Sequence, residues 1–102
     1  MSTPVESLVH VLASAHRTGR LAPADRLDAV SVTTAEGYAA QAGVAIALGE
    51  RVAGWKVGFG PDGLPAAAPL LAGVVARTGA TVPLPPDRPA ILEIEIAFRL
   101  AH

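Results

Sequence analysis

Hydrophobic residues near the N-terminus recur at the spacing of a helix that buries one face. The positions i, i+3, i+4 and i+7 of this pattern are Val5, Leu8, Val9 and Leu12. Thr3 can serve as the N-cap, Pro4 suits the first helical position, and Glu6 has the spacing of a capping box with Thr3. Gly19 offers a C-cap, because glycine adopts the left-handed conformation without steric cost. The pattern therefore predicts a helix between Thr3 and Gly19.

A second helix is predicted after a connector that spans residues 21–32 and contains Pro23. Thr33 and Glu36 again have the spacing of a capping box, and Gly49 again offers a C-cap. The sequence between them is rich in alanine. Alanine permits close helix packing, but it buries little apolar area per residue.

Beyond Arg51 the helical spacing gives way to short apolar runs bounded by glycine and proline. Residues 52–57 read as a strand, and the glycines at 60 and 63 indicate a turn. The apolar run 70–76 fits either a helix or a strand. Residues 81–84 read as a second short strand that ends at two prolines.

The clearest strand pattern lies at the end of the chain, where residues 91–100 alternate with period two. One row holds Leu92, Ile94, Ile96, Phe98 and Leu100, and the other holds Ile91, Glu93, Glu95, Ala97 and Arg99. We therefore expect an α+β fold: two N-terminal helices followed by the start of a mixed β-sheet. Residues 1–50 form the helical segment and residues 51–102 the first part of a β-rich region. Because so apolar a strand needs neighbours, we expect a chain that is truncated inside a fold or completed by another chain.

Composition narrows the classes of function. The 102 residues suffice for one core, and 8 basic against 9 acidic residues leave no basic face for nucleic acid. The absence of cysteine excludes disulfides, thiolate zinc sites and cysteine nucleophiles. No apolar run approaches the roughly 18 residues of a membrane-spanning helix, and no basic segment of a signal peptide is present. We expect a cytoplasmic protein without a nucleic-acid or membrane partner.

Glu93 and Glu95 are candidate metal ligands. Two residues apart on a strand, they lie about 6.6 Å from each other on one face. Carboxylates at this spacing can converge on Mg²⁺ or Mn²⁺, which prefer oxygen ligands. The alternative is a solvated strand face with Arg99 as the counter-ion.

Lys56, the only lysine of the chain, is a candidate catalytic residue. It lies in the segment Gly54-Trp55-Lys56-Val57-Gly58, a predicted strand flanked by glycines. Burial there lowers the pKa of a lysine and makes it a usable proton carrier. The alternative is a lysine whose stem lies along the sheet and whose ammonium stays in water.

The segments 54–58 and 92–98 together resemble the fumarylacetoacetate hydrolase family. The similarity is to its 2-keto-4-pentenoate hydratase branch, which includes related 4-oxalocrotonate decarboxylases. The segments 17–23, 33–41 and 69–84 resemble the same branch in order and spacing, so the resemblance covers nearly the whole chain.

The resemblance implies a metal-dependent hydratase that acts on 2-hydroxy-dienoate or 2-oxo acids in aromatic catabolism. Glu93 and Glu95 match the Glu-x-Glu ligands of a Mg²⁺ or Mn²⁺ ion, and the third acidic ligand of the family lies beyond residue 102. The metal stabilises the enolate-like charge of the substrate, and Lys56 matches an active-site lysine that moves protons. The substrate-binding residues stay unassigned.

Two alternatives remain open at this stage. The chain can be a non-catalytic interaction module that pairs through an open β-edge, either with itself or with a longer partner. It can also be a decarboxylase-like enzyme with the same metal pair. A homo-oligomer, or completion by another chain, is expected under either view.

Overall fold

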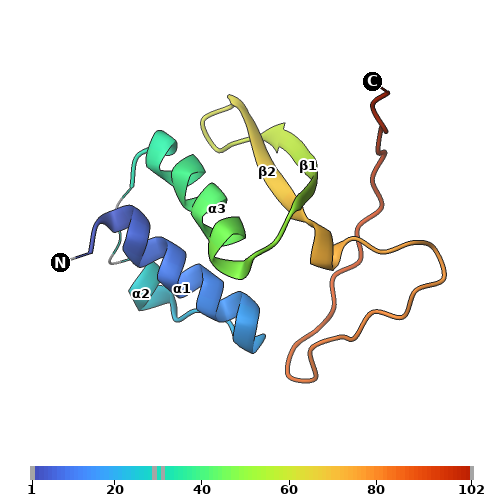
Figure 1. Cartoon of the computed structure of the whole chain (residues 1–102), viewed down its shortest axis with the longest axis horizontal. Coiled ribbons are helices and arrows are strands. Elements are labelled where there is room, and N and C mark those ends of the chain that lie inside the picture. The colour runs from blue at the N-terminus through green and yellow to red at the C-terminus, as the bar shows by residue number, and fades with distance from the viewer. Residues whose placement is uncertain (1, 29, 31, 102) are drawn as a thin grey trace.

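The computed structural model describes residues 2–28, 30 and 32–101 of the chain. Helices come first and a two-stranded antiparallel sheet follows, so the expected α+β class is confirmed (Figure 1). The elements are α1 (Pro4–Thr18), α2 (Ala24–Asp28), α3 (Thr34–Leu48), β1 (Val52–Phe59), β2 (Pro65–Leu71) and a 3-10 turn, η1 (Ala72–Val74). The predicted connector 21–32 thus contains one short helix, and the run 70–76 completes β2 and enters η1.

Both long helices begin and end where the sequence predicts. Thr3 and Glu6 form a capping box at α1, and Thr33 and Glu36 form one at α3. At α3 the Thr33 backbone N–H donates to Glu36 Oε1 over 3.0 Å, and the Glu36 N–H donates to Thr33 Oγ1 over 3.2 Å. Gly19 and Gly49 end the helices with φ of 68° and 65°. These reciprocal bonds satisfy backbone N–H groups that have no partner inside the helix.

The helices α1 and α3 pack side by side and hold most of the small core (Figure 1). Arg17 ties their ends together, because its guanidinium donates to the Ala47 carbonyl over 2.6 Å. The contact between the helices is close, since a Cβ built on Gly43 would lie 2.7 Å from Val9 Cγ2. The buried apolar residues are Val11, Ala13, Ala40, Val44, Ala45 and Leu71.

The strands β1 and β2 form a hairpin next to α3 (Figure 1). Its register pairs Lys56 with Ala68 and Phe59 with Pro65. The Gly60 N–H closes the turn by donating to the Leu64 carbonyl over 2.9 Å. A hairpin alone has a marginal stability in water, so its contact with α3 matters for its position.

The expected strands at 81–84 and 91–100 do not form. In the part of the chain that the structure describes, residues 75–101 contain no helix or strand, and the sheet is a single hairpin rather than the start of a mixed sheet. The segment loops away from η1 and returns along the side of the hairpin (Figure 1). A strand needs a neighbour to accept and donate its backbone hydrogen bonds, and the described residues supply none to this segment.

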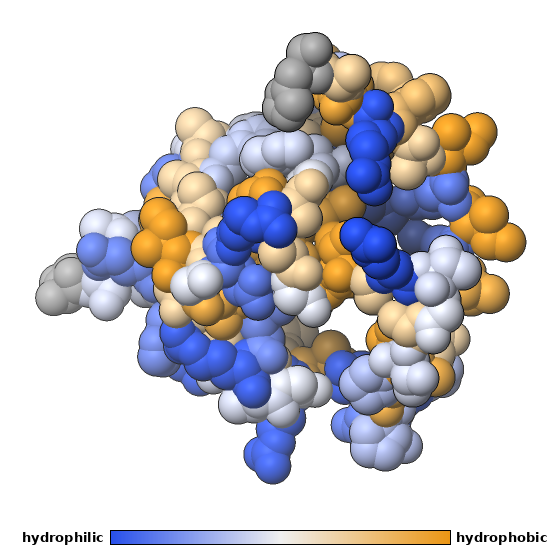
Figure 2. All heavy atoms as spheres, turned by 45° about the vertical axis from the view of Figure 1, so that its right-hand side comes forward, coloured by the Kyte–Doolittle hydropathy of each residue, from blue (hydrophilic) through white to orange (hydrophobic). Residues whose placement is uncertain are grey.

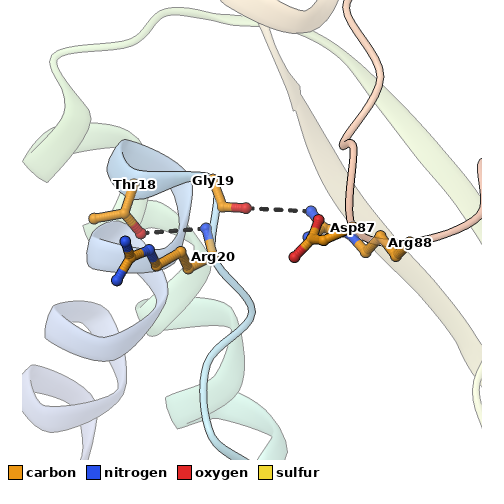
Figure 3. A network of polar contacts seen from close by, with 5 residues as sticks. All are labelled: Thr18, Gly19, Arg20, Asp87 and Arg88. Carbon is orange, nitrogen blue, oxygen red and sulfur yellow. Dashed lines mark hydrogen bonds and ion pairs between the residues drawn. The ribbon is translucent and has the colours of Figure 1, made fainter.

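A polar contact joins the returning segment to the helices. The Arg88 guanidinium donates to the Gly19 carbonyl at the end of α1 over 3.3 Å, and Asp87 accepts from Arg88 over 3.4 Å (Figure 3). The Thr18 hydroxyl accepts from the Arg20 N–H in the same network. A cation at the carboxyl end of a helix also interacts favourably with the helix dipole.

None of the helices in the described residues combines the length and the apolar character that crossing a membrane requires.

Candidate functional site

Lys56 lies in the middle of β1, on the strand that the sequence predicts for it. Its side chain is half exposed, with 50% of its surface accessible. Of the two alternatives for Lys56, the structure therefore shows the exposed lysine and not the buried one. The cause is the small sheet: with only two strands in the described residues, no further layer covers Lys56.

Glu93 and Glu95 meet at the ammonium group of Lys56. Lys56 Nζ lies 3.0 Å from Glu93 Oε2 and 3.0 Å from Glu95 Oε1. Glu93 and Glu95 follow Lys56 by 37 and 39 positions in the chain. The three side chains thus meet although the expected strand over 91–100 does not form. We name this cluster of three side chains the Lys-Glu-Glu cluster. The cation that faces the two carboxylates is Lys56 and not Arg99, which was the alternative counter-ion.

The charges of the cluster reinforce one another. Hydrogen bonds that the Lys56 ammonium donates to Glu93 and to Glu95, together with the negative charges of these carboxylates, raise the pKa of Lys56 above its ordinary value of 10.5. This direction is opposite to the lowered pKa expected from burial. The hydrogen bond and the positive charge of Lys56 hold the pKa of Glu93 below its ordinary value of 4.5. At neutral pH the cluster therefore holds the Lys56 ammonium beside the Glu93 carboxylate.

Tyr38 is a residue whose role the sequence did not reveal. Its hydroxyl accepts a hydrogen bond from the Ala67 backbone N–H over 3.3 Å, which ties α3 to β2. Ala67 is next to Ala68, the register partner of Lys56. Tyr38 is a positioning residue for the hairpin that carries Lys56. A lone tyrosine in an alanine-rich helix was the available signal, because a tyrosine hydroxyl usually seeks a polar partner.

The donor atoms of the cluster fit a divalent cation in part. Oxygens of two carboxylates already face one cation, the ammonium group, from 3.0 Å each. Mg²⁺ and Mn²⁺ take such oxygens and complete their shells with water or substrate oxygens. Among the described residues, no group of three histidine, cysteine, aspartate or glutamate side chains could hold a metal. The two glutamates are thus an incomplete ligand set that must displace Lys56 to bind a metal.

Comparison of the chain with protein-family models, with curated proteins and with solved structures gives no significant match. The Lys-Glu-Glu cluster is therefore the feature of the molecule that points to a function.

Proposed function

We propose that this chain carries part of the active site of a metal-dependent hydratase that acts on 2-hydroxy-dienoate or 2-oxo acids. The observation that supports the proposal is the convergence of Glu93 and Glu95 on Lys56 Nζ, each over 3.0 Å. Those are the three residues that the resemblance to 2-keto-4-pentenoate hydratases assigns to the site.

In this proposal each residue of the cluster has one task. Glu93 and Glu95 provide carboxylate oxygens to a Mg²⁺ or Mn²⁺ ion. When bound, the metal supplies charge that stabilises the enolate-like form of a 2-oxo acid. Lys56, displaced from these carboxylates by the metal, carries a proton at Nζ, and a substrate carboxylate or oxo group can accept a hydrogen bond from it. The half exposure of Lys56 leaves a small acid free access to that proton.

A titration with Mn²⁺, followed by electron paramagnetic resonance, tests the metal site directly. We compare the unmodified chain with Glu93→Gln/Glu95→Gln, and with the control Asp25→Asn/Asp87→Asn, which removes the same charge elsewhere. The variant Glu93→Gln/Glu95→Gln is expected to bind Mn²⁺ at least about tenfold more weakly than the unmodified chain, because it loses both anionic ligands. Equal binding by all three proteins contradicts the proposal.

Lys56→Met gives a second, opposite test of the same site. Lys56 competes with a metal for the two carboxylates, so its removal is expected to tighten Mn²⁺ binding. Weaker binding in Lys56→Met contradicts the view that the ammonium and the metal share one position.

The reaction is tested separately from the metal. The chain is incubated with 2-hydroxypenta-2,4-dienoate and Mg²⁺, and loss of the conjugated dienoate is followed by absorbance. Release of CO₂ from a 2-oxo dicarboxylic acid instead supports the decarboxylase alternative. No turnover of either acid, by this chain or by a longer chain that adds a third acidic ligand, overturns the proposed activity.

A further inference from the structure

The C-terminal segment presents a row of large apolar side chains to solvent. This apolar row consists of Leu92, Ile94, Ile96, Phe98 and Leu100, which are between 85% and 94% exposed. Figure 2 shows hydrophobic side chains protruding on the side of the molecule that the C-terminal segment occupies. Exposed apolar rows of this kind mark interaction surfaces or sites of aggregation.

The backbone of the same segment also lacks hydrogen-bonded partners in the part of the chain that the structure describes. Among the described residues, none between 81 and 101 donates a backbone N–H to another backbone group. An extended segment with free N–H and C=O groups is a template for pairing with another strand.

The order of charges makes the segment complementary to itself. An antiparallel pair of copies related by a two-fold axis at Ile96 places Glu93 opposite Arg99 twice. In the same register the apolar residues face one another, as Leu92 with Leu100, Ile94 with Phe98, and Ile96 with its own copy. The five residues of the apolar row then lie on one face of the ribbon, and the charged side chains lie on the other face together with Ile91 and Ala97.

Neighbouring registers are less favourable. A two-fold axis at Glu95 sets that carboxylate opposite its own copy, and an axis at Ile94 sets Glu93 opposite Glu95 twice. An axis at Ala97 places Glu95 opposite Arg99, but Leu92 then has no partner among the described residues. A parallel, in-register pair puts each glutamate beside its own copy. Like charges that face each other across strands are destabilising.

We infer that residues 91–101 are a self-association surface whose occupant is the same segment of a second copy, paired antiparallel about Ile96. Arg99 is exposed and takes part in no ion pair among the described residues, so it is available to the second copy. Glu93 uses Oε2 for Lys56, which leaves Oε1 for Arg99 of the second copy. Arg99 of each copy then pairs with Glu93 of the other copy, so that one ion pair lies on each side of the two-fold axis. This inference does not depend on the proposed reaction.

Charge reversal and mixing test the pairing. In sedimentation velocity runs over a range of concentrations, the chain is expected to show a dimer that Arg99→Glu weakens at least about tenfold, because Glu93 then faces glutamate. Glu93→Arg is expected to weaken it in the same way, because arginine then faces Arg99. An equimolar mixture of the two variants restores opposite charges at both positions and is expected to dimerise again. The control Arg77→Glu makes the same charge change outside residues 91–101 and leaves the dimer intact.

A cross-link tests the register and does not depend on charge. The chain has no cysteine, so single thiols can be placed at will. Ile96→Cys brings the two new thiols face to face and is expected to give a disulfide-linked dimer under mild oxidation. Leu92→Cys separates the thiols by about 27 Å in this register and is expected to give none.

The outcomes separate the inference from the proposed function. A monomer at all concentrations, a dimer that is insensitive to Arg99→Glu, or cross-linking of Leu92→Cys as fast as Ile96→Cys overturns the inference. None of these readouts involves metal binding or turnover. Far-ultraviolet circular dichroism of each variant checks that α1 and α3 remain folded, as expected for changes outside their contact.

Discussion

The helical region (residues 4–48) and the C-terminal segment (residues 75–101) are both rich in apolar residues, but only the first forms regular structure. A helix closes its backbone hydrogen bonds within its own sequence, and capping boxes complete them at α1 and α3. A strand cannot do so, because its donors and acceptors point sideways toward a neighbour. The contrast shows that an alternating apolar pattern predicts a strand only where a neighbouring strand is present to pair with it.

Hydrogen exchange is expected to give the largest difference between the two regions. Backbone amides in the middle of α1 and α3 are protected by intrahelical bonds and by the packing of the helices. Amides 81–101 donate no backbone hydrogen bond among the described residues, so in dilute protein they are expected to exchange at rates close to those of an unfolded peptide. Mass spectrometry of peptic fragments measures both regions in one experiment.

The same exchange experiment at high protein concentration sharpens the comparison. Pairing with a second copy is expected to protect amides within 91–101 and to leave 81–90 unprotected. Protection of 91–101 that does not depend on concentration would mean that the segment finds its neighbour within one copy. The contrast between the two regions would then be wrong.

The next largest effect is expected on the free energy of unfolding, from changes at the contact between α1 and α3. Ala40 is 1% exposed within α3, so Ala40→Leu forces extra methylene groups into a packed site and is expected to cost about 1–3 kcal/mol of the free energy of unfolding. Ala39→Leu makes the same change at an exposed position of the same helix. Urea unfolding followed by circular dichroism measures both variants. Equal midpoints for the two would show that α3 is not held by close packing.

The capping box of α3 is expected to contribute less to the free energy of unfolding than the contact between α1 and α3. Thr33→Ala removes the hydroxyl that accepts the Glu36 N–H and is expected to cost about 1 kcal/mol. Thermal unfolding at neutral pH gives this value. A loss at Thr33→Ser as large as that at Thr33→Ala would contradict it, because serine keeps the accepting hydroxyl.

The second half of the capping box predicts a dependence on pH. Hydrogen bonds from the Thr33 backbone and hydroxyl hold the pKa of Glu36 below its ordinary value of 4.5. The contribution of the carboxylate is therefore complete above pH 4.5 and is lost as the pH falls through the lowered pKa of the folded state. The stability difference between the unmodified chain and Glu36→Gln is expected to shrink over that range and to be constant above it.

The sequence predicted the features that depend on residues close together in the chain. It did not predict the features that depend on contacts between distant segments. Capping boxes, terminal glycines and the hairpin strand over 52–57 are specified within a few residues, and all are found. The strands expected at 81–84 and 91–100 depend on partners that a pattern cannot supply. For the candidate site, the residue types were sufficient to single out Lys56, Glu93 and Glu95. Their direct contact was not predicted, and the choice between a buried and an exposed Lys56 could not be made from the sequence because it depends on the size of the sheet.

The smallest effect on stability is expected at the Lys-Glu-Glu cluster. The ion pairs join exposed side chains, which solvent screens, so Lys56→Met is expected to leave the unfolding midpoint unchanged within error. The pKa of Glu93 is the sensitive readout, because Lys56 holds it below 4.5 through a hydrogen bond and its positive charge. In Lys56→Met that pKa is expected to rise toward 4.5, as measured by carbon-13 titration of the carboxyl groups in dilute protein. Arg77→Met, the matched loss of a cation elsewhere, leaves it unchanged. A pKa of Glu93 that stays low without Lys56 would show that another cation holds the carboxylate, and its rise on dilution would assign that cation to Arg99 of a second copy.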